Sequence, residues 1–140
     1  MSYLLDTNVV SELRKPQRRA DGNVRAWVAA RAPSDLFLSV ITILEIEVGI
    51  SRIGRRDAAQ AGRLQTWLDD IVLKSFASRI LAVDVPTARQ AARLHVPDPR
   101  PERDALIAAT ALVHDLTVVT RNTADFEPTG VSIIDPWAIG

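Results

Sequence analysis

The stretch Tyr3-Leu4-Leu5-Asp6-Thr7-Asn8 joins a short apolar run to a polar turn that begins with an acid. The apolar run predicts a buried strand at Tyr3–Leu5, and the residues after it predict a short helix from Asn8 to Lys15, ended by Pro16. In a sheet whose parallel strands are connected through helices, an acid at the carboxyl end of a strand lies at the edge where ligands bind. Asp6 is therefore the first candidate for a functional residue.

Further along the chain, strands and helices alternate. Strands are predicted at residues 36–38, 80–83, 117–119 and 131–134, and helices at residues 23–32, 57–76, 86–95 and 103–114. The apolar pattern of residues 41–53 is ambiguous, but its length and the start signal Thr42-x-x-Glu45 favour a helix, on which Glu45 and Glu47 point in nearly opposite directions. The alternation predicts an α/β protein, a three-layer α/β/α sandwich around a mostly parallel sheet of about four or five strands.

Length and composition limit the class of protein. The 140 residues suit one domain, so we expect a single domain over residues 1–140. The absence of cysteine excludes disulfides and thiolate zinc sites. We see no secretory signal pattern and no apolar run long enough to span a bilayer, so we expect a cytoplasmic protein without membrane contact. Seventeen basic residues balance seventeen acidic ones, so net charge alone indicates no polyanionic partner.

Four acids lie where a predicted strand or helix begins or ends: Asp6, Glu45, Asp104 and Asp125. Each has a simpler explanation on its own. Asp6 can cap the helix that follows it, and Glu45 can complete a capping box with Thr42. Asp104 can complement the positive end of its own helix, and Asp125 can be an ordinary loop residue. Together, however, four acids at one edge of a sheet repel one another unless a cation neutralises them.

The types of ligand available indicate which cation this would be. There is no cysteine, and His95 and His114 lie outside the acidic motifs, so oxygen ligands favour Mg²⁺ or Mn²⁺ over zinc. Mg²⁺ commonly binds through one or two carboxylates together with substrate phosphates. The acids therefore predict a magnesium or manganese site that acts on a phosphate, and hydrolysis is the simplest such reaction.

Four motifs, taken in order, carry a resemblance to a known family. They are Asp6-Thr7-Asn8-Val9-Val10-Ser11-Glu12, Ser39-Val40-Ile41-Thr42-x-x-Glu45, Asp104-Ala105-Leu106-Ile107-Ala108-Ala109-Thr110-Ala111 and Thr120-Arg121-Asn122-Thr123-x-Asp125-Phe126. Their order and spacing extend the likeness over nearly the whole chain. The sequence resembles the PIN-domain ribonucleases, in particular the VapC-type toxins of bacterial toxin–antitoxin pairs and their FitB-like group, which shares the dipeptide Pro136-Trp137.

The resemblance implies a role for each motif. Asp6, Glu45 and Asp104 match the family's metal-binding carboxylates, and Asn122 and Asp125 share the fourth position. An amide at Asn122 adds no charge, which leaves the choice between one and two metal ions open. On this resemblance we expect a PIN-like fold and an Mg²⁺- or Mn²⁺-dependent endoribonuclease.

The same residues suggest a mechanism. We hypothesise that Asp6 and Asp104 hold the metal, while Glu45 and Asp125 complete the ligand set and orient or deprotonate the attacking water. The metal polarises the scissile phosphate and lowers the pKa of the water, so cleavage leaves 5′-phosphate and 3′-hydroxyl ends. Polar side chains beside the acids are expected to hold the carboxylates in place, and these are Thr7, Asn8 and Thr120.

Other functions of the same acids fit less well. A phosphatase with an Asp-x-Asp motif would need a second acid where this chain has Asn8, and a receiver domain would need a late lysine, but the lysines are Lys15 and Lys74. The glycine-rich Walker-A motif is absent. Two alternatives stay open: a catalytically weak or inactive PIN module that binds RNA or a protein, and a structure-specific DNase.

Partners are indicated by apolar residues in two helical stretches. Residues 43–53 and 57–76 carry more apolar side chains than one small core needs, which suggests a dimer face or a groove for a partner helix. The resemblance implies an RNA substrate, a VapB-like antitoxin, a homodimer, and a heterotetramer or larger assembly with the antitoxin. No motif in the chain indicates which RNA is cut.

Overall fold

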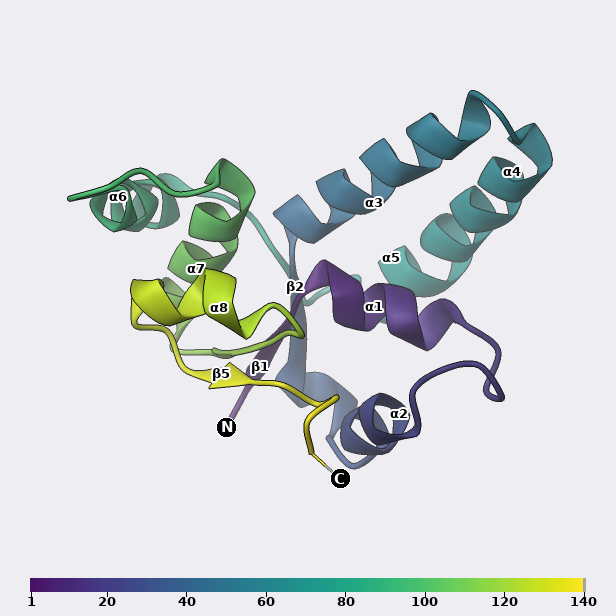
Figure 1. Ribbon diagram of the computed structural model, residues 1–140, viewed down its shortest axis with the longest axis horizontal. Coiled ribbons are helices and arrows are strands. Elements are labelled where there is room, and N and C mark those ends of the chain that lie inside the picture. The colour runs from purple at the N-terminus through teal and green to yellow at the C-terminus, as the bar shows by residue number, and fades with distance from the viewer. Residues whose placement is uncertain (140) are drawn as a thin grey trace.

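The structure is a computed structural model, and it describes residues 1–139 (Figure 1). The strands are β1 (Tyr3–Leu5), β2 (Leu36–Ser39), β3 (Ile80–Leu81), β4 (Thr117–Val119) and β5 (Ile133–Ile134). The helices are α1 (Thr7–Arg14), α2 (Gly22–Ala29), α3 (Val40–Gly54), α4 (Ala58–Trp67), α5 (Leu73–Ser75), α6 (Val85–Leu94), α7 (Glu102–His114) and α8 (Thr123–Phe126). Within residues 1–139, no helix has both the length and the apolar character needed to cross a bilayer.

The five strands form one sheet in the order β3-β2-β1-β4-β5, and each neighbouring pair is parallel. Strand β1 lies in the middle, where Leu4 is in register with Phe37 of β2 and Val118 of β4. Because the strands run in one direction, their carboxyl ends meet at one edge of the sheet. Asp6 follows β1 at this edge, and Thr120 follows β4.

Helices cover both faces of the sheet, which confirms the predicted α/β/α sandwich. Successive residues of β1 point to opposite faces. Tyr3 and Leu5 pack in the core that includes residues of α1, α2, α3 and α4, whereas Leu4 packs in the core that includes residues of α6 and α7. Figure 1 shows α1 to α5 on one side of the sheet and α6 to α8 on the other.

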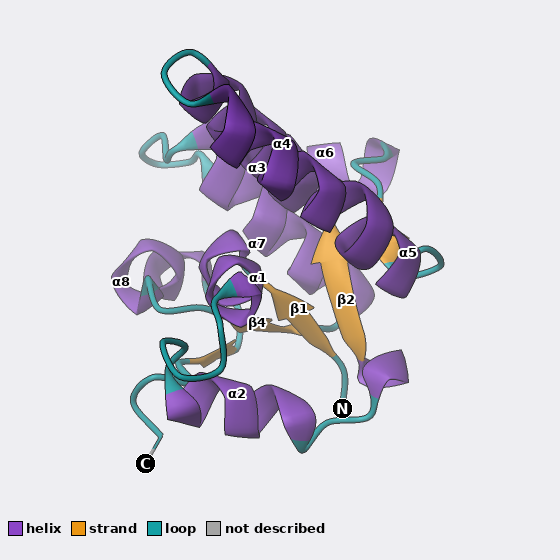
Figure 2. Cartoon of the chain, turned by 90° about the vertical axis from the view of Figure 1, so that its right-hand side faces the viewer, coloured by secondary structure: helices purple, strands orange, loops and turns teal. Residues whose placement is uncertain are grey.

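Helices α3 and α4 lie against each other and extend beyond the rest of the molecule (Figures 1 and 2). Ile46, Ile50 and Leu64 are buried in the core cluster that this helical hairpin shares with β1 and α1. The opposite side of α3 carries exposed apolar residues, including Val40 and Leu44. The apolar residues of 43–53 that the core does not bury lie on this exposed side.

The start signal predicted for α3 is wrong, although the helix begins within one residue of the predicted range 41–53. The helix begins at Val40, because the buried hydroxyl of Ser39 accepts a hydrogen bond from the Ile41 N–H at 3.0 Å. Thr42 therefore lies inside the helix and does not cap it. The capping-box interpretation of Glu45 fails for the same reason, since Ser39 already fills the capping position.

Other differences concern the lengths of elements. The single helix predicted at residues 57–76 consists of α4, a π-helical turn at Leu68–Val72 and α5. The wider turn accompanies the burial of Leu68 and Val72, a packing requirement that periodicity does not register. Strands β3 and β5 are shorter than predicted, and the short helix α8 was expected to be a loop.

Candidate metal centre

Asp6 connects β1 to α1 and is buried, with 6% of its surface exposed. Its backbone N–H donates to the Val119 carbonyl of β4 at 2.9 Å, which continues the pairing of the two strands. Its Oδ1 accepts a hydrogen bond from the Thr7 N–H at 2.8 Å, so the capping role suggested for Asp6 is present. The other oxygen, Oδ2, accepts a hydrogen bond from the Thr120 hydroxyl at 2.8 Å.

Thr120 and Asn8 hold this carboxylate from the side of β4. Thr120 is fully buried, and while its Oγ1 donates to Asp6 it accepts hydrogen bonds from Asn8 Nδ2 at 3.2 Å and from the Asn122 N–H at 3.0 Å. Asn8 Nδ2 also lies 3.4 Å from Asp6 Oδ2. A hydroxyl that donates its one proton and also accepts two hydrogen bonds has little freedom to rotate. The orientation of Asp6 is therefore set by both strands.

Glu45 reaches the same edge from the second turn of α3. Its Oε1 accepts a hydrogen bond from the Thr7 hydroxyl at 2.7 Å, and that hydroxyl lies 3.3 Å from Thr42 Oγ1. Its Oε2 is 4.0 Å from Arg103 Nη1 at the start of α7. The three predicted supporting residues, Thr7, Asn8 and Thr120, thus all contact Asp6, and Thr7 also donates its hydroxyl to Glu45.

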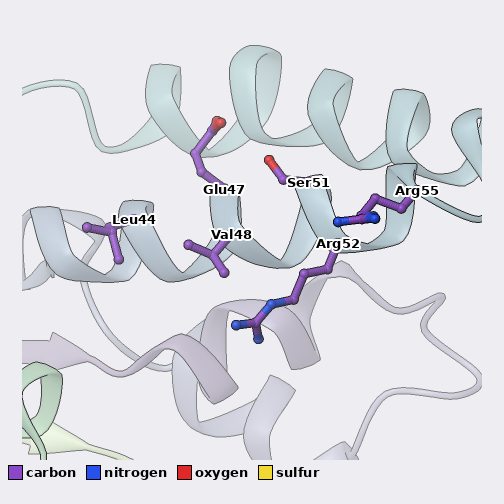
Figure 3. A pocket seen from close by; sticks show the side chains of 6 residues that line it. All are labelled: Leu44, Glu47, Val48, Ser51, Arg52 and Arg55. Atoms are coloured by element: carbon purple, nitrogen blue, oxygen red, sulfur yellow. The ribbon is translucent and has the colours of Figure 1, made fainter.

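Glu47 lies on another side of α3, as the helical spacing predicts. It is exposed, and it lines an open hollow of about 430 Å³ together with Leu44, Val48, Ser51, Arg52 and Arg55 (Figure 3). Glu45 instead borders a hollow of about 200 Å³ between α1, α3 and α4, which Thr7, Ser11 and Arg14 also line. Of these two hollows, only the second adjoins one of the four predicted acids.

Asp104 lies in the first turn of α7 and is half-buried. Burial, together with the negative charges of Asp125, Asp6 and Glu45, raises the pKa of its carboxyl to about 6. Burial also raises the pKa of Asp6, against the lowering effect of the hydrogen bonds from Thr120 and Thr7, and the charges of Glu45 and Asp125 add to the rise. The four predicted acids are therefore near enough to repel one another.

Asp125 and Asn122 differ in their relation to this cluster. The charge of Asp125 acts on both Asp6 and Asp104. Asn122 donates its backbone N–H to Thr120, whereas its side chain makes no hydrogen bond within residues 1–139. Of the two residues predicted to share the fourth position, Asp125 is the one whose charge acts on Asp6 and Asp104.

A divalent cation fits this donor set chemically. The cluster supplies carboxylate oxygens, the ligands that Mg²⁺ prefers, and among residues 1–139 Arg103 is the cation within ion-pair distance of one of the four acids. His95 Nδ1 accepts the Arg100 N–H, and His114 ends α7 at the opposite end from Asp104, so neither histidine belongs to the cluster. As the side chains stand, no three acidic or histidine residues among those described are arranged to hold an ion.

Sequence reasoning missed Arg103 and the two residues of α1 that line the adjoining hollow, Ser11 and Arg14. Arg103 precedes the Asp104 motif, and its closeness to Glu45 depends on how α7 meets α3. Ser11 and Arg14 follow Thr7 at intervals of about one and two helical turns, so the spacing on α1 would have indicated a shared face.

The substitution Asp104→Asn is expected to stabilise the metal-free protein at neutral pH. The folded-state pKa of Asp104 is about 6, above the usual 3.8, so the folded state binds the proton more tightly than the unfolded state. Protonation therefore stabilises the fold as the pH falls from about 6 towards 3.8. Above pH 6 the charged carboxyl lowers the stability. Urea unfolding in the presence of a chelator, at about pH 7.5 and about pH 4.5, measures this. The gain from the substitution should shrink at the lower pH. Exposed Asp98→Asn serves as the control, and an equal gain at both pH values would contradict the assignment.

Comparison with known proteins agrees with this geometry. The family model described as PIN domain matches residues 3–130. The chain is 37% identical to the VapC ribonuclease Y4jK of Sinorhizobium fredii, over 96% of each chain. The crystal structure of FitAcB from Neisseria gonorrhoeae is similar with a TM-score of 0.88 and 34% identity, over 98% of this chain and 99% of that one.

A toxin–antitoxin complex from Klebsiella pneumoniae is also similar, with a TM-score of 0.70 and 28% identity over 99% of this chain and 100% of that one. The family model covers most of the chain, the ribonuclease relative is matched over nearly its full length, and the sheet brings the expected acids to one edge. On these grounds the chain belongs to the PIN-domain family.

Proposed function

We propose that this protein is an Mg²⁺- or Mn²⁺-dependent endoribonuclease and the toxin of a toxin–antitoxin pair, folded as a single PIN domain. The observation that carries the proposal is the group of four acids at the carboxyl edge of the parallel sheet, close enough to raise the pKa of Asp6 and Asp104. Carboxylates that repel one another in this way attract a divalent cation. The similarity to a relative named as a ribonuclease favours RNA as the substrate.

Each acid has a role that follows from its contacts. Asp6 is buried and Asp104 is half-buried, and burial raises the pKa of both, so we assign them to hold the metal. Thr120 and the Thr7 N–H keep the Asp6 carboxylate in one orientation. The carboxylate is therefore already ordered before an ion binds. When bound, Mg²⁺ polarises the phosphate and makes a water molecule more acidic.

Glu45 and Asp125 complete the proposed site. Thr7 fixes one oxygen of Glu45 and leaves the other facing Arg103, while Asp125 is exposed. We assign these two carboxylates to orient the attacking water and accept its proton. Attack by water in line with the leaving 3′ oxygen yields a 5′-phosphate on one product and a 3′-hydroxyl on the other.

The substitution Thr120→Val tests the supporting contact without removing an acid. Val has nearly the shape of Thr but cannot donate to Asp6, so cleavage of RNA in the presence of Mg²⁺ should fall by about 10- to 100-fold. Asp104→Asn should lose more activity than Thr120→Val, because it removes a proposed ligand.

The matched control is Thr66→Val, because the exposed Thr66 on α4 donates only to the Gly62 carbonyl of its own helix. Full activity of Thr120→Val, or products with 2′,3′-cyclic phosphate ends, would contradict the mechanism. Activity on single-stranded DNA alone would instead support the DNase alternative, and binding without cleavage would support an inactive module.

We further propose that a second copy of the chain covers the exposed side of α3, and that the antitoxin occupies a different surface. Val40, Leu44 and Val48 follow one another at intervals of one helical turn, and Leu44 is 44% exposed. The antitoxin is assigned to the apolar hollow of about 130 Å³ between α1 and the α4–α5 segment, which is bordered by Ile71. The similar complex from Klebsiella pneumoniae favours such a partner.

Light scattering after gel filtration tests the dimer. The purified chain should be a dimer, and Leu44→Asp should make it a monomer, because a charge in an apolar interface is costly to desolvate. Ile71→Asp, at a position 56% exposed on the other apolar surface, is the matched control and should remain a dimer. A monomeric parent chain, or a Leu44→Asp variant that stays dimeric, would refute the assignment.

A further inference from the structure

Arg121 lies in the loop after β4, next to residues that hold the Asp6 carboxylate. It directly follows Thr120, which donates to Asp6, and its backbone N–H donates to Asn8 Oδ1 at 3.3 Å. Asn8 in turn donates through Nδ2 to Thr120. The backbone of Arg121 is therefore tied to the residues that orient the Asp6 carboxylate, although Arg121 itself is exposed.

The guanidinium of Arg121 is available to bind an anion. Within residues 1–139 it makes no ion pair and no side-chain hydrogen bond. The acid whose pKa it helps to lower is Glu12, but the two oxygens of Glu12 already accept hydrogen bonds from Lys15 Nζ and the Asp21 N–H, each at 2.9 Å. Arg121 thus keeps its forked set of donors unpaired.

An aromatic ring holds this guanidinium in place. The Arg121 guanidinium carbon lies over the ring of Trp137, 5.3 Å from the ring centroid. Trp137 is fixed in turn. Its backbone N–H donates to Asp135 Oδ1 at 2.9 Å, its backbone carbonyl accepts from Asn23 Nδ2 at 3.4 Å, and its side chain packs against the core. A side chain that is ordered in advance loses less entropy when it binds a ligand.

An RNA strand that reaches the acids meets strong negative charge there. Arg103 lies 4.0 Å from Glu45, so part of its charge is already compensated on that side. On the side of Thr120, Arg121 makes no ion pair with any acid among residues 1–139. An arginine fork suits the geometry of a phosphate, and its weak hydration suits contact with an aromatic face.

We propose that Arg121 binds a phosphate of the RNA strand next to the one that is cut, with Trp137 as the residue that positions its guanidinium. This subsite rests on the proposed ribonuclease function. Its ligand class is the phosphate of a single-stranded nucleic acid. Binding there would place the neighbouring phosphate at the acidic cluster and offset part of the repulsion between acids and strand.

RNA binding without cleavage tests the subsite. The probe is a fluorescent oligouridine of roughly 12 nucleotides, and the protein is the Asp6→Asn variant in chelator, with Kd measured between about 50 and 200 mM salt. Each phosphate contact on a single strand adds about 0.7 to the slope of log Kd against log salt. Arg121→Gln should lower that slope by about 0.7 and weaken binding by about fivefold at 100 mM salt.

Two variants separate this effect from a general loss of charge. Arg121→Lys keeps the charge without the fork, so it should keep the slope while binding more weakly. Arg18→Gln removes an exposed arginine beyond the far end of α1 and should leave both slope and Kd unchanged. An unchanged slope in Arg121→Gln, or an equal drop in Arg18→Gln, would overturn the subsite.

The role of Trp137 is tested by a double-mutant cycle. Trp137→Leu should weaken RNA binding when Arg121 is present and have no further effect in Arg121→Gln, because it acts through the guanidinium. Trp137→Phe keeps a ring and should restore part of the affinity, and thermal unfolding confirms that each variant is folded. Equal losses in both backgrounds would reject the positioning role.

The outcome can be separated from that of the ribonuclease proposal. If Arg121→Gln lowers the slope but the parent chain cuts no RNA, the subsite is supported and the ribonuclease proposal is rejected. If the parent chain cuts RNA but Arg121→Gln leaves the slope unchanged, the ribonuclease proposal is supported and the subsite is rejected. A deoxythymidine strand of the same length identifies the source of the phosphate. An equal effect of Arg121→Gln on DNA and RNA means that the site reads the phosphate alone, and an effect limited to DNA would overturn the assignment to RNA.

Discussion

The hydrogen bond from Thr120 to Asp6 is the contact on which the candidate site depends. It joins the residues that follow β4 and β1, two parallel neighbours whose pairing continues through the Asp6 N–H and the Val119 carbonyl. Because Thr120 is fully buried and its oxygen also accepts from Asn8 and Asn122, one hydroxyl connects the β1–α1 junction to the segment that follows β4. The sheet thereby fixes the direction of the innermost carboxylate.

The remaining acids are brought to this point by helices. Glu45 comes from α3, Asp104 from α7 and Asp125 from α8, so three separate packing contacts with the sheet are needed. The arrangement has an electrostatic cost, which is visible in the raised pKa of Asp104 and Asp6. A folded protein retains such a cost chiefly at functional sites, and a bound cation would remove it.

Much of this could be predicted from the sequence because it depends on local patterns. The apolar run before Asp6 gave a strand, the alternation of strands and helices gave a parallel sheet, and the position of each acid at the end of an element placed them at one edge. Glu45 and Glu47 lie on different sides of α3 because helical geometry requires it.

What could not be predicted depends on contacts between distant segments. Ser39 rather than Thr42 caps α3, because the serine hydroxyl is already buried at the end of β2. The π-helical turn at Leu68–Val72 follows from packing, and α8 is too short to give a periodic signal. The contact of Arg121 with Trp137 joins two loops that no spacing in the sequence relates.

The most direct test of the central claim is to map RNA 5′ ends in bacteria that express the chain alone, beside bacteria that express Asp6→Asn. The account predicts growth arrest with new 5′-phosphate ends at discrete positions, both absent from the variant. No new ends, or the same ends and the same arrest with Asp6→Asn, would contradict a metal-dependent endoribonuclease.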